Sequence, residues 1–257
     1  MLYDSFDPAP KALINPEDHH SLIPGFPEIC IMAFSKHIVE QCLERYGGEP
    51  IAWVKFCTGE VPIYRVEIDG TPIALSLPHV GGPTASTFIE EVWPRGGKCF
   101  VFFGAAGVLD STIPLNSFLL PTAAVRDEGL SYHYMAPSEE VELDPACVAA
   151  CRGALESLGL PYREGKTWTT DAFYRETRGK IQQRKAQGCI SVEMECASLA
   201  AAAQFRGVKF AQFFYTTDNL DGPVWDNGVL HQKGASVTEE CLAAAVETGR
   251  RLARISQ

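Results

Sequence analysis

Three acidic residues flank a run of small residues in the last third of the chain. Glu193 and Glu195 come directly before an alanine-rich stretch, which is long enough for a helix of about four turns. Asp218 follows Lys209 to Thr216, an apolar and aromatic segment with the composition of a buried strand. Ligands of open α/β sheets bind at the carboxyl ends of the strands. These carboxylates are therefore candidates for binding or catalysis.

Each of these carboxylates also has a simpler interpretation. A carboxylate at a strand end or before a helix is often a helix cap or a solvated loop residue. For Glu193, a structural hydrogen-bonding role and a ligand-binding role stay open as equal alternatives.

The composition is that of a globular α/β protein. The chain has 257 residues, of which 46% are hydrophobic and 21% are charged, and this length fits one large domain better than two small ones. A net charge of −10 argues against a general nucleic-acid-binding protein. No apolar run approaches the roughly 20 residues of a membrane span, and the first residues lack the pattern of a signal peptide. We therefore expect no membrane partner and a cytoplasmic location.

The nine cysteines are scattered singly and form no Cys-x-x-Cys pair. This pattern is typical of small buried side chains in a reducing compartment. The sequence predicts neither a metal site nor a cofactor.

The remaining elements can be assigned from their residue patterns. Residues 1–27, rich in Pro, Asp and His, are expected to form an irregular N-terminal arm, and residues 28–257 one α/β domain. The pattern predicts strands at 29–33, 99–103 and 116–125, a hairpin at 64–77 around Asp69-Gly70, helices at 36–46, 145–158 and 239–255, and a loop at 221–228. Residues 178–185 are expected to form a basic, polar helix or a lid-like segment, with a merely solvated face as the alternative.

Four stretches of the chain resemble one enzyme family. They are Val192 to Glu195 with Thr217-Asp218 at the family's spacing, the turn at Val80 to Ser86, residues 116–134 and residues 167–174. They are similar to motifs of the purine nucleoside and uridine phosphorylases, a family that includes the methylthioadenosine nucleosidases. The resemblance extends over roughly residues 28 to 253.

The resemblance implies a fold and an assembly. It implies a single-domain, three-layer α/β/α structure with a central mixed, twisted sheet, and a homodimer or homohexamer. Family sites borrow residues from a neighbouring subunit, so His19 or His20 of the arm is a candidate for such a contribution, with a solvated histidine pair as the alternative.

The resemblance also implies roles for the acidic residues. Met194 and Glu195, together with Glu193, would hold the ribose, and Asp218 would protonate or hydrogen-bond the departing base. Breaking an N-glycosidic bond builds positive charge on the sugar and negative charge on the base. A carboxylate-lined sugar site and a proton donor to the base suit that reaction.

Other family positions concern the base. Phe173 would pack against it, and the backbone at Ala106 and Gly107 would border it. Thr177 and Gly179 stand where uridine-specific members have Gln and Arg, so a preference for uracil is not supported, and the choice between purine and pyrimidine stays open.

The phosphate half of the family site is altered. Phosphate needs fixed cations, usually arginine, but Gly59 and Phe102 stand at two of the family's arginine positions. Candidates for binding an anion are Lys36, His37 and the backbone of Gly81.

Three functions follow from the resemblance. The first is a nucleoside phosphorylase of nucleoside salvage with inorganic phosphate as co-substrate. The second is a nucleosidase that uses water, because the arginines are absent. The third is a catalytically silent nucleoside-binding protein.

Overall fold

The computed structural model describes residues 6–256 and arranges ten strands in one mixed sheet. The strands are β1 (Ile29–Ala33), β2 (Glu49–Phe56), β3 (Gly59–Ile68), β4 (Thr71–Ser76), β5 (Cys99–Val108), β6 (Phe118–Asp127), β7 (Glu140–Glu142), β8 (Tyr162–Thr170), β9 (Cys189–Glu193) and β10 (Lys209–Asn219). The helices are α1 (Pro16–His19), α2 (Lys36–Tyr46), α3 (Gly82–Val92), α4 (Ser131–Tyr134), α5 (Pro145–Ser157), α6 (Arg178–Ala186), α7 (Cys196–Arg206) and α8 (Thr238–Arg254).

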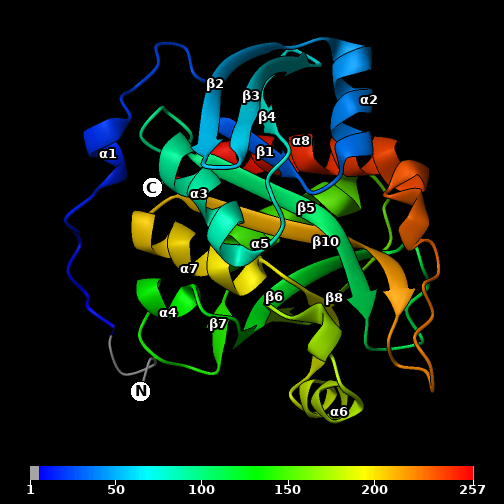
Figure 1. Cartoon of the computed structure of the whole chain (residues 1–257). Coiled ribbons are helices and arrows are strands. Elements are labelled where there is room, and N and C mark those ends of the chain that lie inside the picture. The colour runs from blue at the N-terminus through cyan, green and yellow to red at the C-terminus, as the bar shows by residue number, and fades with distance from the viewer. Residues whose placement is uncertain (1–5, 257) are drawn as a thin grey trace.

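The sheet closes on itself at one end. Nine of its strands follow the order β10-β6-β8-β9-β5-β1-β4-β3-β2, β10 also pairs with β5, and the short β7 pairs with β6. Five strands, β10, β6, β8, β9 and β5, therefore form a closed ring, from which β1, β4, β3 and β2 continue as an open sheet (Figure 1). The sheet contains parallel pairs such as β1–β5 and β5–β10 and antiparallel pairs such as β5–β9, so it is mixed as expected.

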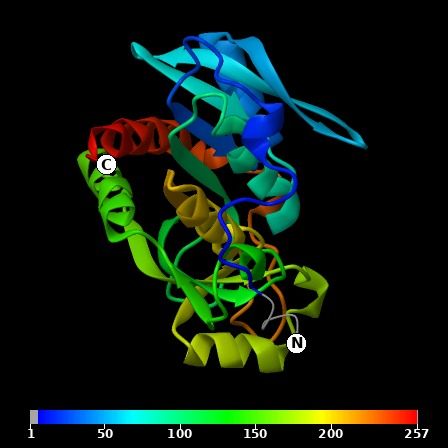
Figure 2. The same ribbon diagram turned by 90° about the vertical axis from the view of Figure 1, so that its left-hand side faces the viewer.

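Helices cover the sheet on both sides. On one side α5 packs against α8, which also contacts β1, β4 and β5, and α2 extends this layer. On the other side α7 packs against α3, α4, β6 and β10. The two views in Figures 1 and 2 show these helices on opposite sides of the central strands. The expectation of a three-layer α/β/α fold is confirmed.

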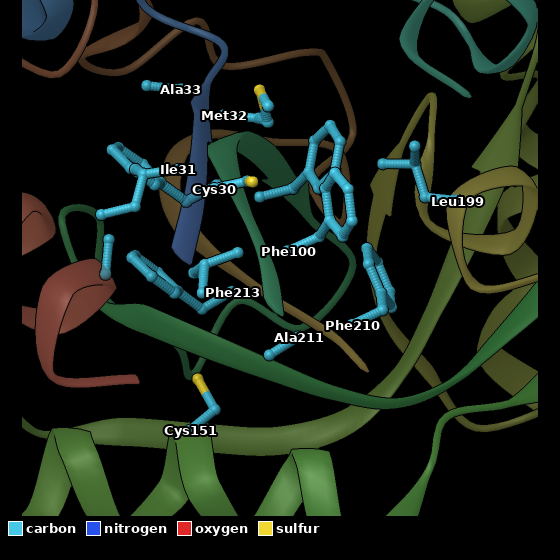
Figure 3. Close-up of a cluster of buried hydrophobic side chains, with 14 of the residues drawn as sticks. Cys30, Ile31, Met32, Ala33, Phe100, Cys151, Leu199, Phe210, Ala211 and Phe213 are labelled. Atoms are coloured by element: carbon cyan, nitrogen blue, oxygen red, sulfur yellow. The ribbon is translucent and has the colours of Figure 1, made fainter. Parts of the chain in front are cut away.

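The central strands form because they are almost entirely apolar. Every residue of β1 is buried, and nine of the ten residues of β5 are buried. Parallel strands that are covered on both faces have such continuous apolar runs. Figure 3 shows the resulting core on the two faces of these strands. The rings of Phe100 and Phe210 lie towards Leu199 of α7, and Ile31 lies with Phe213 on the other side.

Two strands are longer than their sequences predict. Strand β5 continues five residues beyond Phe103, through the small residues Gly104 to Gly107, and β10 continues to Asn219. The expectation that Asp218 lies just beyond its strand was wrong. It lies inside β10 and pairs with Gly107, after a bulge that follows Thr216. Glycine is needed at position 107 because a Cβ atom there would lie 2.4 Å from Leu220 Cδ1.

The turn at Asp69-Gly70 and the end of α7 follow the predicted chemistry. Asp69 and Gly70 both have positive φ, 48° and 72°, as a two-residue hairpin turn requires. Gly207 ends α7 in the left-handed conformation, with φ of 65°. Within residues 6–256, no helix is long and apolar enough to cross a membrane.

The contact between α3 and α7 depends on small side chains. A Cβ atom placed on Gly82 would lie 2.2 Å from Ser198 Oγ and 2.8 Å from Ser198 Cβ. Ser198 Oγ in turn donates a hydrogen bond of 2.5 Å to Glu128. Ser198 therefore has little freedom to move away.

We predict that Gly82→Ala lowers the free energy of unfolding by about 1–3 kcal/mol, the usual cost of forcing extra volume into a packed contact. Chemical denaturation measures the change. The control is Gly179→Ala in α6, where an added Cβ meets no atom within 4 Å and where alanine favours the helix by up to about 1 kcal/mol. Equal stability of G82A and the unmodified protein would contradict the packing described.

Candidate active site

The candidate site lies where β5, β9 and β10 end. Asp218 pairs with Gly107, and Gly107 pairs on its other side with Val192. A Cβ atom on Gly107 would lie 3.3 Å from Asp218 Oδ2 and 2.4 Å from Leu220 Cδ1. Glycine at this position leaves the Asp218 carboxylate accessible from the β5 side.

A cavity of about 670 Å³ opens at these strand ends. Most of its lining is apolar or aromatic, and a few ionisable side chains lie among these groups, which is the usual composition of a small-molecule site. The lining residues are Ala105, Ala106, Gly107, Phe173, Tyr174, Glu176, Arg178, Ile181, Val192, Glu193, Met194, Thr217, Asp218, Leu220, Gly222, Pro223, Val224, Trp225 and Leu230.

The structure brings six of the predicted residues into this cavity. Asp218, Met194 and Glu193 line it together with the three residues expected near the base, Phe173, Ala106 and Gly107. Phe173 is half exposed, and its ring lies 4.1 Å from that of Tyr174, centroid to centroid. An aromatic ring available at a cavity wall can stack on a planar ligand.

Both oxygens of the Asp218 carboxylate accept hydrogen bonds. Thr217 Oγ1 donates to Oδ1 at 2.9 Å, and Trp225 Nε1 donates to Oδ2 at 2.7 Å. Trp225 belongs to the loop after β10, which an isolated bridge between Asn219 and Asp226 folds back onto the strand end. The loop therefore orients the Asp218 side chain.

Glu193 holds the start of α7. Its Oε2 accepts hydrogen bonds from the backbone N–H groups of Glu195 and Cys196, each at 2.7 Å. Thr169 Oγ1 donates to its Oε1 at 2.6 Å. The N–H groups of a first helical turn have no partner within the helix, so this carboxylate serves as a helix cap while it also lines the cavity. Burial, followed by the charge of Glu195, raises the pKa of the Glu193 carboxyl.

Glu195 connects α7 to the turn before α3. Its Oε1 accepts a hydrogen bond of 2.7 Å from the backbone N–H of Gly81. Gly81 has φ of 99°, a conformation that glycine adopts readily. Burial raises the pKa of Glu195, whose side chain is not among the residues that line the 670 Å³ cavity.

The residues predicted to bind an anion lie outside this cavity. Lys36 is exposed and pairs with Glu40 at 3.4 Å, and neither His37 nor Gly81 lines the cavity. Phe102, at one of the family's arginine positions, is fully buried, and its ring lies 5.9 Å from that of Phe34.

His20 contacts its own chain rather than the cavity. Its Nδ1 lies 3.1 Å from Arg95 Nη2, and its Nε2 lies 3.4 Å from Glu91. Burial, with the charge of Arg95, lowers the pKa of His20. A contribution of His19 or His20 to a neighbouring subunit stays a prediction.

Sequence reasoning missed Glu176. This residue follows the 3₁₀ turn of Phe173–Arg175 and is partly buried in the cavity wall. Burial, with a further contribution from the charge of Asp218, raises the pKa of its carboxyl to about 7. Its place three residues after Phe173 was the only signal, and a glutamate in a loop is ordinarily solvated.

Comparisons with known proteins agree on one family. A protein-family model described as the phosphorylase superfamily matches residues 28–255. A uridine phosphorylase of Escherichia coli (strain K12) is 28% identical over an alignment of 164 residues, which covers 58% of this chain and 65% of that protein. The chain thus matches just under two thirds of the length of that relative.

Two further relatives extend the comparison. A guanosine phosphorylase of Halorubrum lacusprofundi is 25% identical over 197 residues, 77% of this chain and 79% of the relative. The crystal structure of an AMP nucleosidase from Bacteroides thetaiotaomicron VPI-5482 superimposes with a TM-score of 0.71, covering 89% of this chain and 90% of that one. At 20% identity, this second likeness concerns the fold.

We predict that Glu176→Gln is more thermostable than the unmodified protein at about pH 8.5, and that the difference shrinks towards about pH 5. The folded-state pKa of Glu176 is raised from 4.5 to about 7. The folded protein therefore binds this proton more tightly than the unfolded chain, and the resulting stability is lost as the pH rises through 7. Thermal unfolding across this pH range measures the effect.

Glu164→Gln is a control of opposite sign. A hydrogen bond from Arg152 lowers the pKa of Glu164, so this variant should be the less stable one at about pH 8.5. A stability difference for E176Q that does not vary with pH would contradict the raised pKa.

Proposed function

Because the chain belongs to the phosphorylase superfamily, we propose that it cleaves the N-glycosidic bond of a nucleoside. The observation that carries this proposal is the shared cavity of Phe173, Met194 and Asp218 at the strand ends. Phe173 offers an aromatic face for the base, Met194 lies at the start of α7 on the sugar side, and Asp218 offers a carboxylate to the base edge.

Glu195 is the candidate for the sugar hydroxyls. A carboxylate has about four acceptor positions, and the Gly81 N–H occupies one of them. Glu195 is buried and does not line the 670 Å³ cavity, so its other acceptor positions would meet a vicinal diol only where the sugar reaches beyond that lining. The contact with Gly81 would keep Glu195 in place, and its negative charge would stabilise the positive charge that develops on the sugar.

The geometry favours water over phosphate as the molecule that attacks the sugar. Among the described residues that line the cavity, Arg178 is the one cation, and its backbone lies at the exposed start of α6. Phe34 and Phe102 pack on each other in the region where the family has phosphate-binding groups. These aromatic rings carry no positive charge that could bind phosphate, whereas a water molecule needs no such charge.

Phosphorolysis is the second candidate. The named relatives include uridine and guanosine phosphorylases, and Arg178 lines the cavity. A phosphate ion that entered the cavity would have this single guanidinium as its partner there. A homodimer or homohexamer and a cytoplasmic location stay predictions.

Base release from a panel of purine and pyrimidine nucleosides, measured with and without inorganic phosphate, tests whether water or phosphate attacks the sugar. We predict release at the same rate in both conditions, with free sugar as the second product. Release that requires phosphate and yields a sugar 1-phosphate would contradict hydrolysis and support phosphorolysis. Binding of nucleosides without release in either condition would support a silent binding protein.

We predict that Asp218→Asn lowers kcat/KM for base release by about 10²- to 10⁴-fold, the range for a positioned acid or base group. The matched control is Asp226→Asn in the loop after β10, eight residues further along the chain, where the carboxylate accepts a hydrogen bond from Gly228 N–H outside the cavity. Steady-state kinetics of the two variants separates a local effect from a general one. Equal losses in both variants would contradict a specific role for Asp218.

A further inference from the structure

The cavity contains a second carboxyl group at the end where the base is expected. Glu176 and Asp218 both line it, Glu176 from the segment between the Phe173–Arg175 turn and α6, and Asp218 from β10. They are close enough for the charge of Asp218 to act on Glu176. Phe173 lies three residues before Glu176, so an aromatic face and a carboxyl group come from one short segment.

The two carboxyl groups have different surroundings. Asp218 accepts hydrogen bonds from Thr217 and Trp225, one at each of its two oxygens. For Glu176, the causes acting on its carboxyl are burial and the charge of Asp218, and no described residue donates a hydrogen bond to it. Both causes favour the neutral, protonated form.

Other charged groups around Glu176 can also be named. Glu193 faces the cavity from the end of β9, and its carboxylate is engaged by the start of α7. Arg178 lines the cavity from the first residue of α6.

We propose that Glu176 donates the proton to the departing base, while Asp218 accepts a hydrogen bond from the base edge. This assignment rests on the proposed function. It reverses the expectation from the family resemblance, in which Asp218 carries the proton. Pairs of carboxyl groups with contrasting surroundings commonly divide the work in this way, one as acid and the other as carboxylate.

The proton and the electrons balance as follows. The bond between C1′ and the base nitrogen breaks, and its electron pair stays with the base. The Glu176 proton passes to a basic ring atom of the base, so that a neutral base leaves. A water oxygen bonds to C1′ and loses its proton to solvent, and the Glu176 carboxylate takes up a proton from solvent. The sum is nucleoside plus water giving base plus free sugar, with no oxidant or other co-reactant.

The test compares the unmodified protein with Glu176→Gln on two kinds of substrate. One is the best nucleoside of the panel, whose base needs a proton to leave. The other is a nitrophenyl riboside, whose phenolate leaves without one. We expect E176Q to lower kcat on the nucleoside by about 10²- to 10⁴-fold, to leave kcat on the nitrophenyl riboside nearly unchanged, and to abolish the fall in nucleoside kcat above about pH 7 that the unmodified protein should show.

Arg175→Gln is the matched control, because Arg175 precedes Glu176, is exposed and does not line the cavity. It should keep the kcat and the pH profile of the unmodified protein. Thermal unfolding of E176Q verifies that it is folded.

Each other outcome overturns the assignment. If E176Q keeps the nucleoside kcat and its fall at alkaline pH, another group supplies the proton. If E176Q loses activity equally on both substrates, the role of Glu176 is structural. If the unmodified protein releases base and lacks the fall above about pH 7, the inference fails while the proposed function stands. If the unmodified protein releases no base from any nucleoside, the proposed function fails and the inference falls with it.

Discussion

The register between β5 and β10 is the constraint on which the site depends. Both strands extend past the apolar core, and their last pairs set Asp218 beside Gly107. A shift by one residue would turn Asp218 to the other face of the sheet, because side chains alternate along a strand. The stacked rings of Phe103 and Phe213, 5.1 Å apart at their centroids, belong to the buried pairs that hold this register. The aromatic core therefore determines where the carboxylate lies.

The second constraint is that buried carboxyl groups need hydrogen-bond donors. Glu193 accepts hydrogen bonds from backbone N–H groups at the start of α7, and Glu195 accepts one from the N–H of Gly81. These contacts fix the start of α7 against the turn before α3, so the methionine between the two glutamates faces the cavity. No described residue donates a hydrogen bond to Glu176. Burial raises the pKa of all three carboxyl groups, and of the three only Glu193 and Glu195 are held in place by backbone N–H groups of the described chain.

Much of this arrangement could be predicted from the sequence. Apolar runs predicted the central strands, Asp69-Gly70 predicted its hairpin, and the spacing of Met194 and Asp218 placed them at one site. The predicted end of β10 was wrong. The strand continues past its apolar segment through a bulge and pairs with β5 as far as Asn219, which the composition does not indicate. Glu176 was missed because its burial arises from residues distant in the sequence, among them Asp218 and the loop at Trp225. Hydrophobic patterns predict elements, but the surroundings of a single carboxyl group depend on tertiary packing.

The most direct measurement is a crystal structure with a bound C-nucleoside, whose carbon–carbon glycosidic bond resists cleavage. The account predicts that the base stacks on Phe173 beside Gly107, that its edge lies within hydrogen-bond distance of both Asp218 and Glu176, and that the sugar lies against Met194 and Glu195. A nucleoside bound elsewhere on the chain, or one whose base touches neither carboxyl group, would contradict the account.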